Sequence, residues 1–73
     1  MKTYFSSNIK FLRKRKGITQ NEIADTLKMK RPTLSGLENE VSQPTISALL
    51  IFSKFYNIAI DTLLNIDLAK LSE

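Results

Sequence analysis

The sequence predicts an all-α fold, a compact bundle of five short helices that forms a single domain. Three observations predict it. The chain has 73 residues, which is enough for one modest core. Apolar residues recur at helical spacing, and no long stretch alternates apolar and polar residues as a strand would. Signals for the start and the end of helices, such as Pro32 and Gly17, separate these segments.

The first helix is expected over residues 5–16. Phe5, Ile9 and Leu12 fall on one face of it, which predicts that they enter the core. Basic residues crowd its last turns, where positive charge suits the negative end of the helix dipole. Gly17 follows directly, and a glycine in the left-handed conformation is a common way to end a helix.

The second helix, expected over residues 20–27, has the clearest start in the chain. Thr19 stands three residues before Glu22, which is the spacing of a capping box. In that motif, each side chain accepts a hydrogen bond from the backbone N–H of the other residue. Ile18 and Ile23 flank the box at the positions of a hydrophobic staple, so the prediction for this helix start is strong.

The third helix is expected over residues 31–40, because Pro32 is tolerated only in the first turn of a helix. Only residues 28–30 separate it from the second helix, so the two helices form a tight corner. Such a corner is typical of a helix-turn-helix, in which the second helix enters the major groove of DNA.

The two sides of this corner are predicted to differ. The residues expected to anchor it from inside are Leu27, Met29, Leu34 and Leu37. The residues expected to face outward, toward the bases, are Lys30, Arg31, Pro32, Ser35 and Gly36. Arg31 is the best candidate for reading a base, because the fork of its guanidinium matches guanine. The alternative for Arg31 is a solvated position at the start of the helix.

The last third of the chain is predicted to hold two more helices, the fourth from residue 44 or 45 to about residue 56 and the fifth over about residues 60–65. One face of the fourth is expected to carry Ile46, Leu49, Phe52, Ser53 and Tyr56. Leu63 and Leu64 are expected to close the core. Residues 1–66 are predicted to form the domain and residues 67–73 a tail, which is frayed, joins a dimer interface or leads to a further domain.

Charge is divided unevenly along the chain. Residues 1–31 carry nine Lys and Arg against two acids, a net charge of +7, whereas residues 32–73 carry two Lys against five acids, a net charge of −3. A basic half on a small domain is typical of a protein that binds a polyanion. A solvated basic face without a partner is the alternative.

The composition argues against an enzyme and against a metal or cofactor site. The chain has no His and no Cys, so it lacks the commonest general base and the commonest soft metal ligand. Its longest apolar run, residues 48–52, is far shorter than the roughly 20 residues of a membrane span. We therefore expect no cofactor, no membrane contact and a cytoplasmic location.

Several stretches at fixed spacing point together to one family. They are Asn8-Ile9-Lys10-x-Leu12-Arg13, Gly17-Ile18-Thr19-Gln20-x-Glu22-Ile23-Ala24-x-x-Leu27, Leu34-Ser35-x-Leu37-Glu38-Asn39, Pro44-Thr45 and Asp61-x-Leu63-Leu64. From residue 8 to residue 64, about four-fifths of the chain, the sequence resembles the phage-repressor and Cro-type helix-turn-helix proteins. The resemblance implies a five-helix bundle like that of lambda repressor and a function in binding DNA.

The resemblance also implies roles for single positions toward DNA. Gln20 matches a position that grips a phosphate, although a solvated position in the first turn of its helix is the alternative. Thr33 matches a position near the DNA backbone, and Asn39 matches a phosphate contact at the end of the third helix. The positions that match groove-facing ones are again Lys30, Arg31, Pro32, Ser35 and Gly36.

Other matched positions imply structural roles. Arg13 and Glu38 match a partly buried ion pair that ties the first helix to the third, and two solvated surface charges are the alternative. Ile60 and Thr62 match positions at a dimer contact. The chain departs from the family pattern where the family usually has Gly, at Lys28, Glu40 and Asn57.

Together these implications predict a sequence-specific DNA-binding regulator of transcription, expected to be a repressor. It is expected to act as a homodimer on a palindromic operator in double-stranded DNA, because a two-fold dimer matches a palindrome. One alternative is an antitoxin-type module that binds a protein partner and also its own promoter. Another is the DNA-binding headpiece of a longer repressor.

Overall fold

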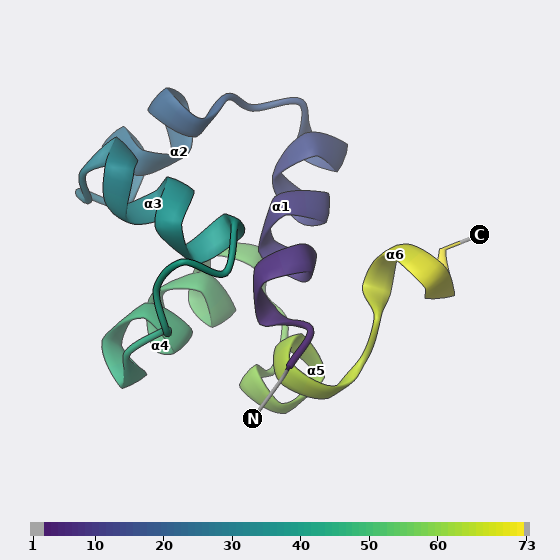
Figure 1. Cartoon of the computed structure of the whole chain (residues 1–73). Coiled ribbons are helices and arrows are strands. Elements are labelled where there is room, and N and C mark those ends of the chain that lie inside the picture. The colour runs from purple at the N-terminus through teal and green to yellow at the C-terminus, as the bar shows by residue number, and fades with distance from the viewer. Residues whose placement is uncertain (1–2, 73) are drawn as a thin grey trace.

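The computed structural model describes residues 3–72, and all of its regular elements in that range are helices (Figure 1). They are α1 (Phe5–Lys16), α2 (Gln20–Thr26), α3 (Arg31–Glu38), α4 (Ile46–Tyr56), α5 (Ile60–Asn65) and α6 (Leu68–Leu71). The prediction of an all-α fold is confirmed, and α6 is added to the five expected helices. Residues 1, 2 and 73 of the predicted domain and tail lie outside the described residues.

The helix ends follow the local signals in the sequence. The capping box is present, with the Thr19 hydroxyl accepting from Glu22 N–H at 3.1 Å and the Glu22 carboxylate accepting from Thr19 N–H at 2.8 Å. The hydrogen bond from the Thr19 backbone N–H to the carboxylate, with a smaller effect of the Thr19 side chain, lowers the pKa of Glu22. Gly17 ends α1 and Asn57 ends α4, both in the left-handed conformation, with φ of 73° and 55°.

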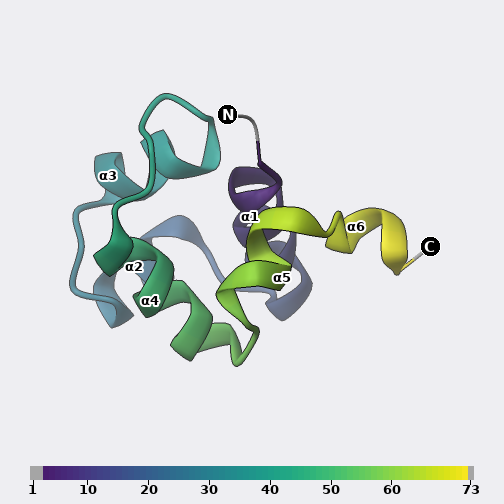
Figure 2. The same ribbon diagram turned by 90° about the horizontal axis from the view of Figure 1, so that it is seen from below.

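Helix α1 lies in the middle of the molecule, with the α2–α3 corner on one side and α6 on the other (Figure 1). Seen from below, α5 crosses α1, and the backbone N–H of Tyr4 donates to the carbonyl of Leu64 at 3.0 Å (Figure 2). In both views α4 and α6 lie on opposite sides of the molecule.

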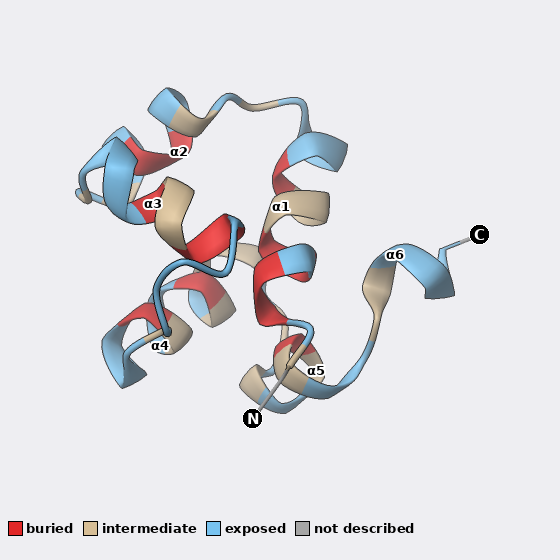
Figure 3. Cartoon of the chain, viewed as in Figure 1, coloured by how far each residue is buried: buried red, intermediate tan, exposed pale blue. Residues whose placement is uncertain are grey.

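The core takes side chains from each of the first five helices, and their buried faces turn inward (Figure 3). Its buried apolar members are Phe5, Ile9, Ile23, Ala24, Leu34, Leu37, Ala48, Phe52 and Leu63. The rings of Phe5 and Phe52 meet edge to face at a centroid distance of 5.7 Å, which joins α1 directly to α4. The core therefore fixes α3 and α4 relative to one another through α1.

The core-facing position predicted for Ile46 is wrong. Ile46 is 77% exposed, because α4 begins at this residue and its buried stripe starts at Ala48. Two residues correspond to about 200° around a helix, so Ile46 points away from the side that Ala48 buries. The stripe continues through Phe52 to Tyr56, as predicted.

Asn8 attaches the C-terminal segment to α1. Its side chain is fully buried, and its Nδ2 donates to the carbonyls of Leu63 at 2.8 Å and Ile66 at 2.7 Å. Its Oδ1 accepts from the N–H of Leu68 at 3.0 Å. The residues that the sequence indicated as a tail therefore dock on α1 and form α6, which Asp67 caps at its start. Within residues 3–72 no helix is long and apolar enough to cross a membrane.

Candidate nucleic-acid interface

The corner between α2 and α3 is closed by backbone hydrogen bonds. The N–H of Met29 donates to the carbonyl of Ala24 at 2.9 Å, and the N–H of Lys28 donates to that of Asp25 at 3.2 Å. Lys28 adopts a left-handed φ of 57°, a conformation that disfavours residues other than glycine. Leu27 and Met29 pack against the core, and Leu34 and Leu37 are buried, as predicted for the inner side of the corner.

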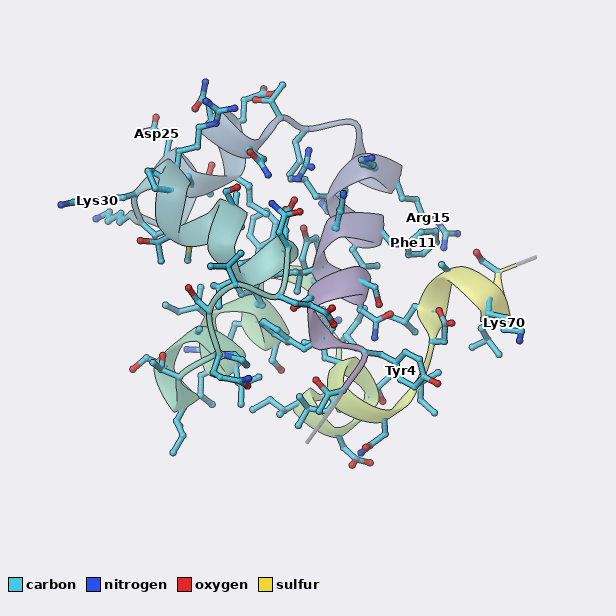
Figure 4. The ribbon with its side chains drawn as sticks, viewed as in Figure 1. Tyr4, Phe11, Arg15, Asp25, Lys30 and Lys70 are labelled. Carbon is cyan, nitrogen blue, oxygen red and sulfur yellow. The ribbon has the colours of Figure 1, made fainter. Side chains whose placement is uncertain are left out.

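The outer side of the corner is polar and exposed at the start of α3. Lys30, Arg31, Pro32 and Thr33 are all exposed, and Figure 4 shows Lys30 extending away from the body of the molecule. One turn further on, Ser35 is half-buried and Asn39 is exposed. The amide of Asn39 donates to the Ser35 hydroxyl at 3.2 Å. The first turn of α3 is therefore its most accessible part.

The loop that joins α3 to α4 passes close to α3 (Figure 1), and its Ser42 approaches Gly36. A Cβ atom on Gly36 would lie 2.8 Å from the Ser42 hydroxyl oxygen, so glycine permits this close approach. The carbonyl of Gly36 accepts from the N–H groups of Val41 at 2.9 Å and Ser42 at 3.1 Å. A larger residue at this position would require the Ser42 side chain to move. The predicted position of Gly36 facing the bases stays a prediction.

Arg13 and Glu38 form a buried ion pair between α1 and α3. The Nε of Arg13 donates to Glu38 Oε2 at 2.8 Å and its Nη2 donates to Oε1 at 3.1 Å, with side chains 10% and 1% exposed. This two-pronged geometry is the strongest that Arg and a carboxylate form. The hydrogen bond to Glu38 raises the pKa of Arg13 above its usual value, which favours the charged guanidinium.

Two further side chains touch or adjoin this pair. The amide of Gln20 donates from Nε2 to Glu38 Oε1 at 3.0 Å. On the inner side, burial raises the pKa of Tyr56 to about 12, and the nearby carboxylate of Glu38 adds to this shift. Tyr56 therefore stays neutral, and its hydroxyl donates to the carbonyl of Ile9 at 3.4 Å.

A cleft of about 380 Å³ opens between the end of α1 and the start of α2. Its lining includes Lys14, Gln20, Asn21 and Arg31, so it joins the predicted phosphate contact to the predicted base reader. None of the described residues that line it is acidic. A cleft lined by cations and side-chain amides suits an anion such as a phosphodiester.

The outer face of α4 has the opposite chemistry. Ile46, Leu50 and Ile51 are exposed on it, and the exposed Val41 stands in the loop before it. Ile60 and Thr62, the predicted dimer residues, are half-buried on α5. Ile46 and Leu50 lie one turn apart on α4, so its outer face is apolar.

Two contacts were not predicted from the sequence. The buried position of Asn8 had a signal, because Asn8 lies three residues after Phe5 and four before Leu12, on the core-facing stripe. The bond between Gln20 and Glu38 had none, because it joins residues 18 positions apart on two helices. Among residues 3–72 no three acidic side chains lie close enough together to hold a metal ion.

Comparison with known proteins identifies relatives over most of the chain. The Helix-turn-helix family model matches residues 9–63. The HTH-type transcriptional activator BcrR of Enterococcus faecalis is 33% identical over 61 residues, which are 84% of this chain and 30% of that protein. The uncharacterized HTH-type transcriptional regulator YqaE of Bacillus subtilis strain 168 is 35% identical over 60 residues, which are 82% of this chain and 52% of that protein.

A solved structure supports the fold. The crystal structure of a transcriptional regulator from Listeria innocua matches with a TM-score of 0.79 and 23% sequence identity, over 88% of this chain and 60% of that one. At this identity the likeness shows the fold alone. The chain spans about a third and about half of the lengths of the two curated relatives.

Proposed function

The chain belongs to the helix-turn-helix family of Cro and CI type, and on that basis we propose that it binds double-stranded DNA and regulates transcription, in the cytoplasm. The observation that carries the proposal is the α2–α3 corner, whose outer side is basic and exposed while its inner side is packed into the core. A helix held in this way can enter the major groove without unfolding any part of the core.

Affinity and sequence choice come from different residues in this proposal. Cations at the corner and on the cleft beside it, among them Lys30 and Lys14, neutralise phosphates and supply most of the affinity. The first turn of α3 reads the sequence, with Arg31 donating two hydrogen bonds to guanine and Pro32 contacting a thymine methyl. Ser35 supplies a hydroxyl toward the same groove.

Contacts to the sugar-phosphate backbone set the orientation of α3. Gln20 lies on the basic cleft beside Arg31, which supports a phosphate contact there. Thr33 and Asn39 are exposed toward the two ends of α3, which supports the proposal that they contact the strands that border the groove. Such contacts place the protein on the duplex and carry no sequence information of their own.

The proposed functional unit is a homodimer on a palindromic operator. Two half-sites would lie one helical turn, roughly 34 Å, apart. Ile60 and Thr62 are the proposed dimer residues, and the exposed apolar residues of α4 offer a further surface for a protein contact. Repression stays a prediction, since BcrR, one of the relatives, is named an activator.

Selection of bound sequences from a random pool of duplex DNA tests the proposal. We expect a consensus of two inverted half-sites at a fixed spacing. Lys30→Ala should reduce the recovery of bound DNA, whereas Lys70→Ala should not. Both changes remove one exposed positive charge, but Lys70 lies on α6, at the opposite end of the molecule from Lys30 (Figure 4). A pool without enrichment, or equal effects of the two changes, would contradict the proposal.

A further inference from the structure

The buried Arg13–Glu38 pair makes two side-chain hydrogen bonds beyond itself, and both lead to the start of α2. Glu38 accepts from the side chain of Gln20, and Arg13 donates to the carbonyl of Ile18. We propose that this pair positions Gln20 for its contact with a DNA phosphate, so that Glu38 is a positioning residue of the DNA interface. The inference rests on the proposed function.

The carboxylate of Glu38 has three hydrogen-bond donors within reach. Arg13 donates to Oε2 at 2.8 Å and to Oε1 at 3.1 Å, and Gln20 donates to Oε1 at 3.0 Å. The Glu38 side chain is only 1% exposed, so water does not compete with Gln20 for this oxygen. A charged acceptor in a poorly solvated place makes a stronger hydrogen bond than a neutral or solvated one.

Arg13 holds the backbone at the same place. Its Nη1 donates to the carbonyl of Ile18 at 3.0 Å. Ile18 lies two residues before Gln20 and next to the N-cap Thr19. The guanidinium therefore fixes the position from which α2 starts, while Glu38 fixes the direction of the first side chain of that helix. Through one ion pair, α1 and α3 together control both the backbone and the side chain at residue 20.

The bond to Glu38 occupies one of the two N–H groups of the Gln20 amide. The second N–H remains to donate toward the basic cleft, which Gln20 lines together with Lys14 and Arg31. A glutamine is flexible and loses much rotamer freedom when it is fixed. Because Glu38 removes that freedom before DNA arrives, the phosphate contact costs less at the moment of binding.

The main test replaces the pair without leaving a buried charge. The double variant Arg13→Met with Glu38→Met keeps an apolar filling and should fold. We expect it to bind operator and random DNA more weakly by the same factor, about threefold to tenfold, because one hydrogen bond to phosphate is lost. The slope of log affinity against log salt should fall by at most about 0.9, since at most one phosphate contact is affected.

Adding Gln20→Ala to both backgrounds shows whether the effect passes through Gln20. In the parent protein, Gln20→Ala should weaken binding by the same threefold to tenfold. In the double-Met background it should add little, because Gln20 has already lost its anchor. An equal effect of Gln20→Ala in the two backgrounds would overturn the proposal.

A stability-matched control separates positioning from loss of fold. Leu64→Ala removes a half-buried side chain on α5, away from residues 18–20, and should lower the melting temperature while DNA affinity stays at the parent level. If Leu64→Ala weakens DNA binding as much as the double-Met change does, the effect reflects stability and the proposal fails.

An experiment on the free protein tests the contact between Gln20 and Glu38 independently of DNA binding. The chain has two glutamines, Gln20 and Gln43, and Gln43 is exposed in the loop before α4. In NMR spectra of the free protein, one side-chain amide proton of Gln20 should exchange with solvent clearly more slowly than those of Gln43. This difference should persist in Leu64→Ala and vanish in the double-Met variant. Equal exchange in the parent would show that Glu38 does not hold Gln20, even if the protein binds DNA.

Discussion

Helices α3 and α4 pack into the same core, but the side chains that they expose to solvent differ in chemistry. The outer side of α3 begins with the exposed cations Lys30 and Arg31. The outer side of α4 exposes Ile46 and Leu50, and its single charged residue is Lys54. A basic face and an apolar face suit different partners, the first a polyanion and the second a protein surface.

The two helices are also anchored differently on their inner sides. Helix α4 is held by Phe52, which is fully buried against Phe5. Helix α3 is held by Leu34 and Leu37, and also by the ion pair from Glu38 to α1. An apolar anchor tolerates small changes of geometry, whereas a two-pronged ion pair defines distance and direction. The helix proposed to read DNA is thus the one with the directional anchor.

The largest effect on stability is expected when the ion pair between Arg13 and Glu38 is broken. Glu38→Ala leaves the Arg13 charge buried without a partner and should cost about 3–5 kcal/mol of unfolding free energy. The melting temperature should fall by more than about 10 °C in a domain of this size, as followed by circular dichroism. The double change of Arg13 and Glu38 to Met should recover part of the loss. A Glu38→Ala melt that overlays the parent would mean that both charges are solvated and that the two anchors do not differ.

The next effect concerns the apolar side of the molecule. Ile60→Asp should leave the monomer folded but remove cooperative binding to a full palindrome, which lowers affinity for the full site by about a hundredfold. Binding to an isolated half-site should change little, and sedimentation should show the monomer. If the variant still fills both half-sites cooperatively, the dimer contact lies elsewhere, with Ile51 and Phe55 or residues 66–71 as the next candidates.

A smaller effect is expected on the basic side. Arg31→Ala should cost about 1–3 kcal/mol on the operator and relax one of its positions, because one guanine loses its two-pronged contact. Competition binding with operator and random duplexes measures both changes. Lys14→Ala is the matched control and should weaken both duplexes equally. Equal losses for Arg31→Ala on both duplexes would instead make Arg31 a phosphate contact, in keeping with its place on the cleft.

The smallest effect is expected on the free energy of unfolding, at the turn before α3 and the turn after α4. Lys28 and Asn57 both have a left-handed φ, of 57° and 55°. The left-handed conformation is more strained for lysine than for asparagine, so Lys28→Gly should raise the unfolding free energy by about 0.5–1 kcal/mol. Asn57→Gly should change it less. Urea denaturation of the two variants checks this order, and the reverse order would show that strain at Lys28 is relieved by contacts.

Local signals in the sequence predicted most of the fold. The capping box of Thr19 and Glu22 and the helix end at Gly17 depend on near neighbours, so a short window of sequence contains all the information that they need. The inner side of the α2–α3 corner followed from helical spacing. For the same reason the candidate face of α3 could be proposed before its surroundings were known.

Features that depend on distant residues could not be predicted in this way. Ile46 has the right spacing to join the stripe of α4 but stands at its very start, and only the packed core shows where the stripe begins. The approach of Ser42 to Gly36 depends on the path of a loop. The bond from Gln20 to Glu38 requires three helices to be in place, because Arg13 shares the same carboxylate.

The side chain of Asn8 bears on the order in which the chain assembles. Its hydrogen bonds join residues separated by 55, 58 and 60 positions, so they close a loop over nearly the whole chain. Loop closure costs more entropy as the loop lengthens, whereas α2 and α3 are neighbours in sequence and meet after a short turn. We therefore expect the α2–α3 corner to form early and the attachment of residues 63–68 to α1 to form late. In the reverse direction, the amide of Leu68 should be among the first to exchange when the native protein opens locally.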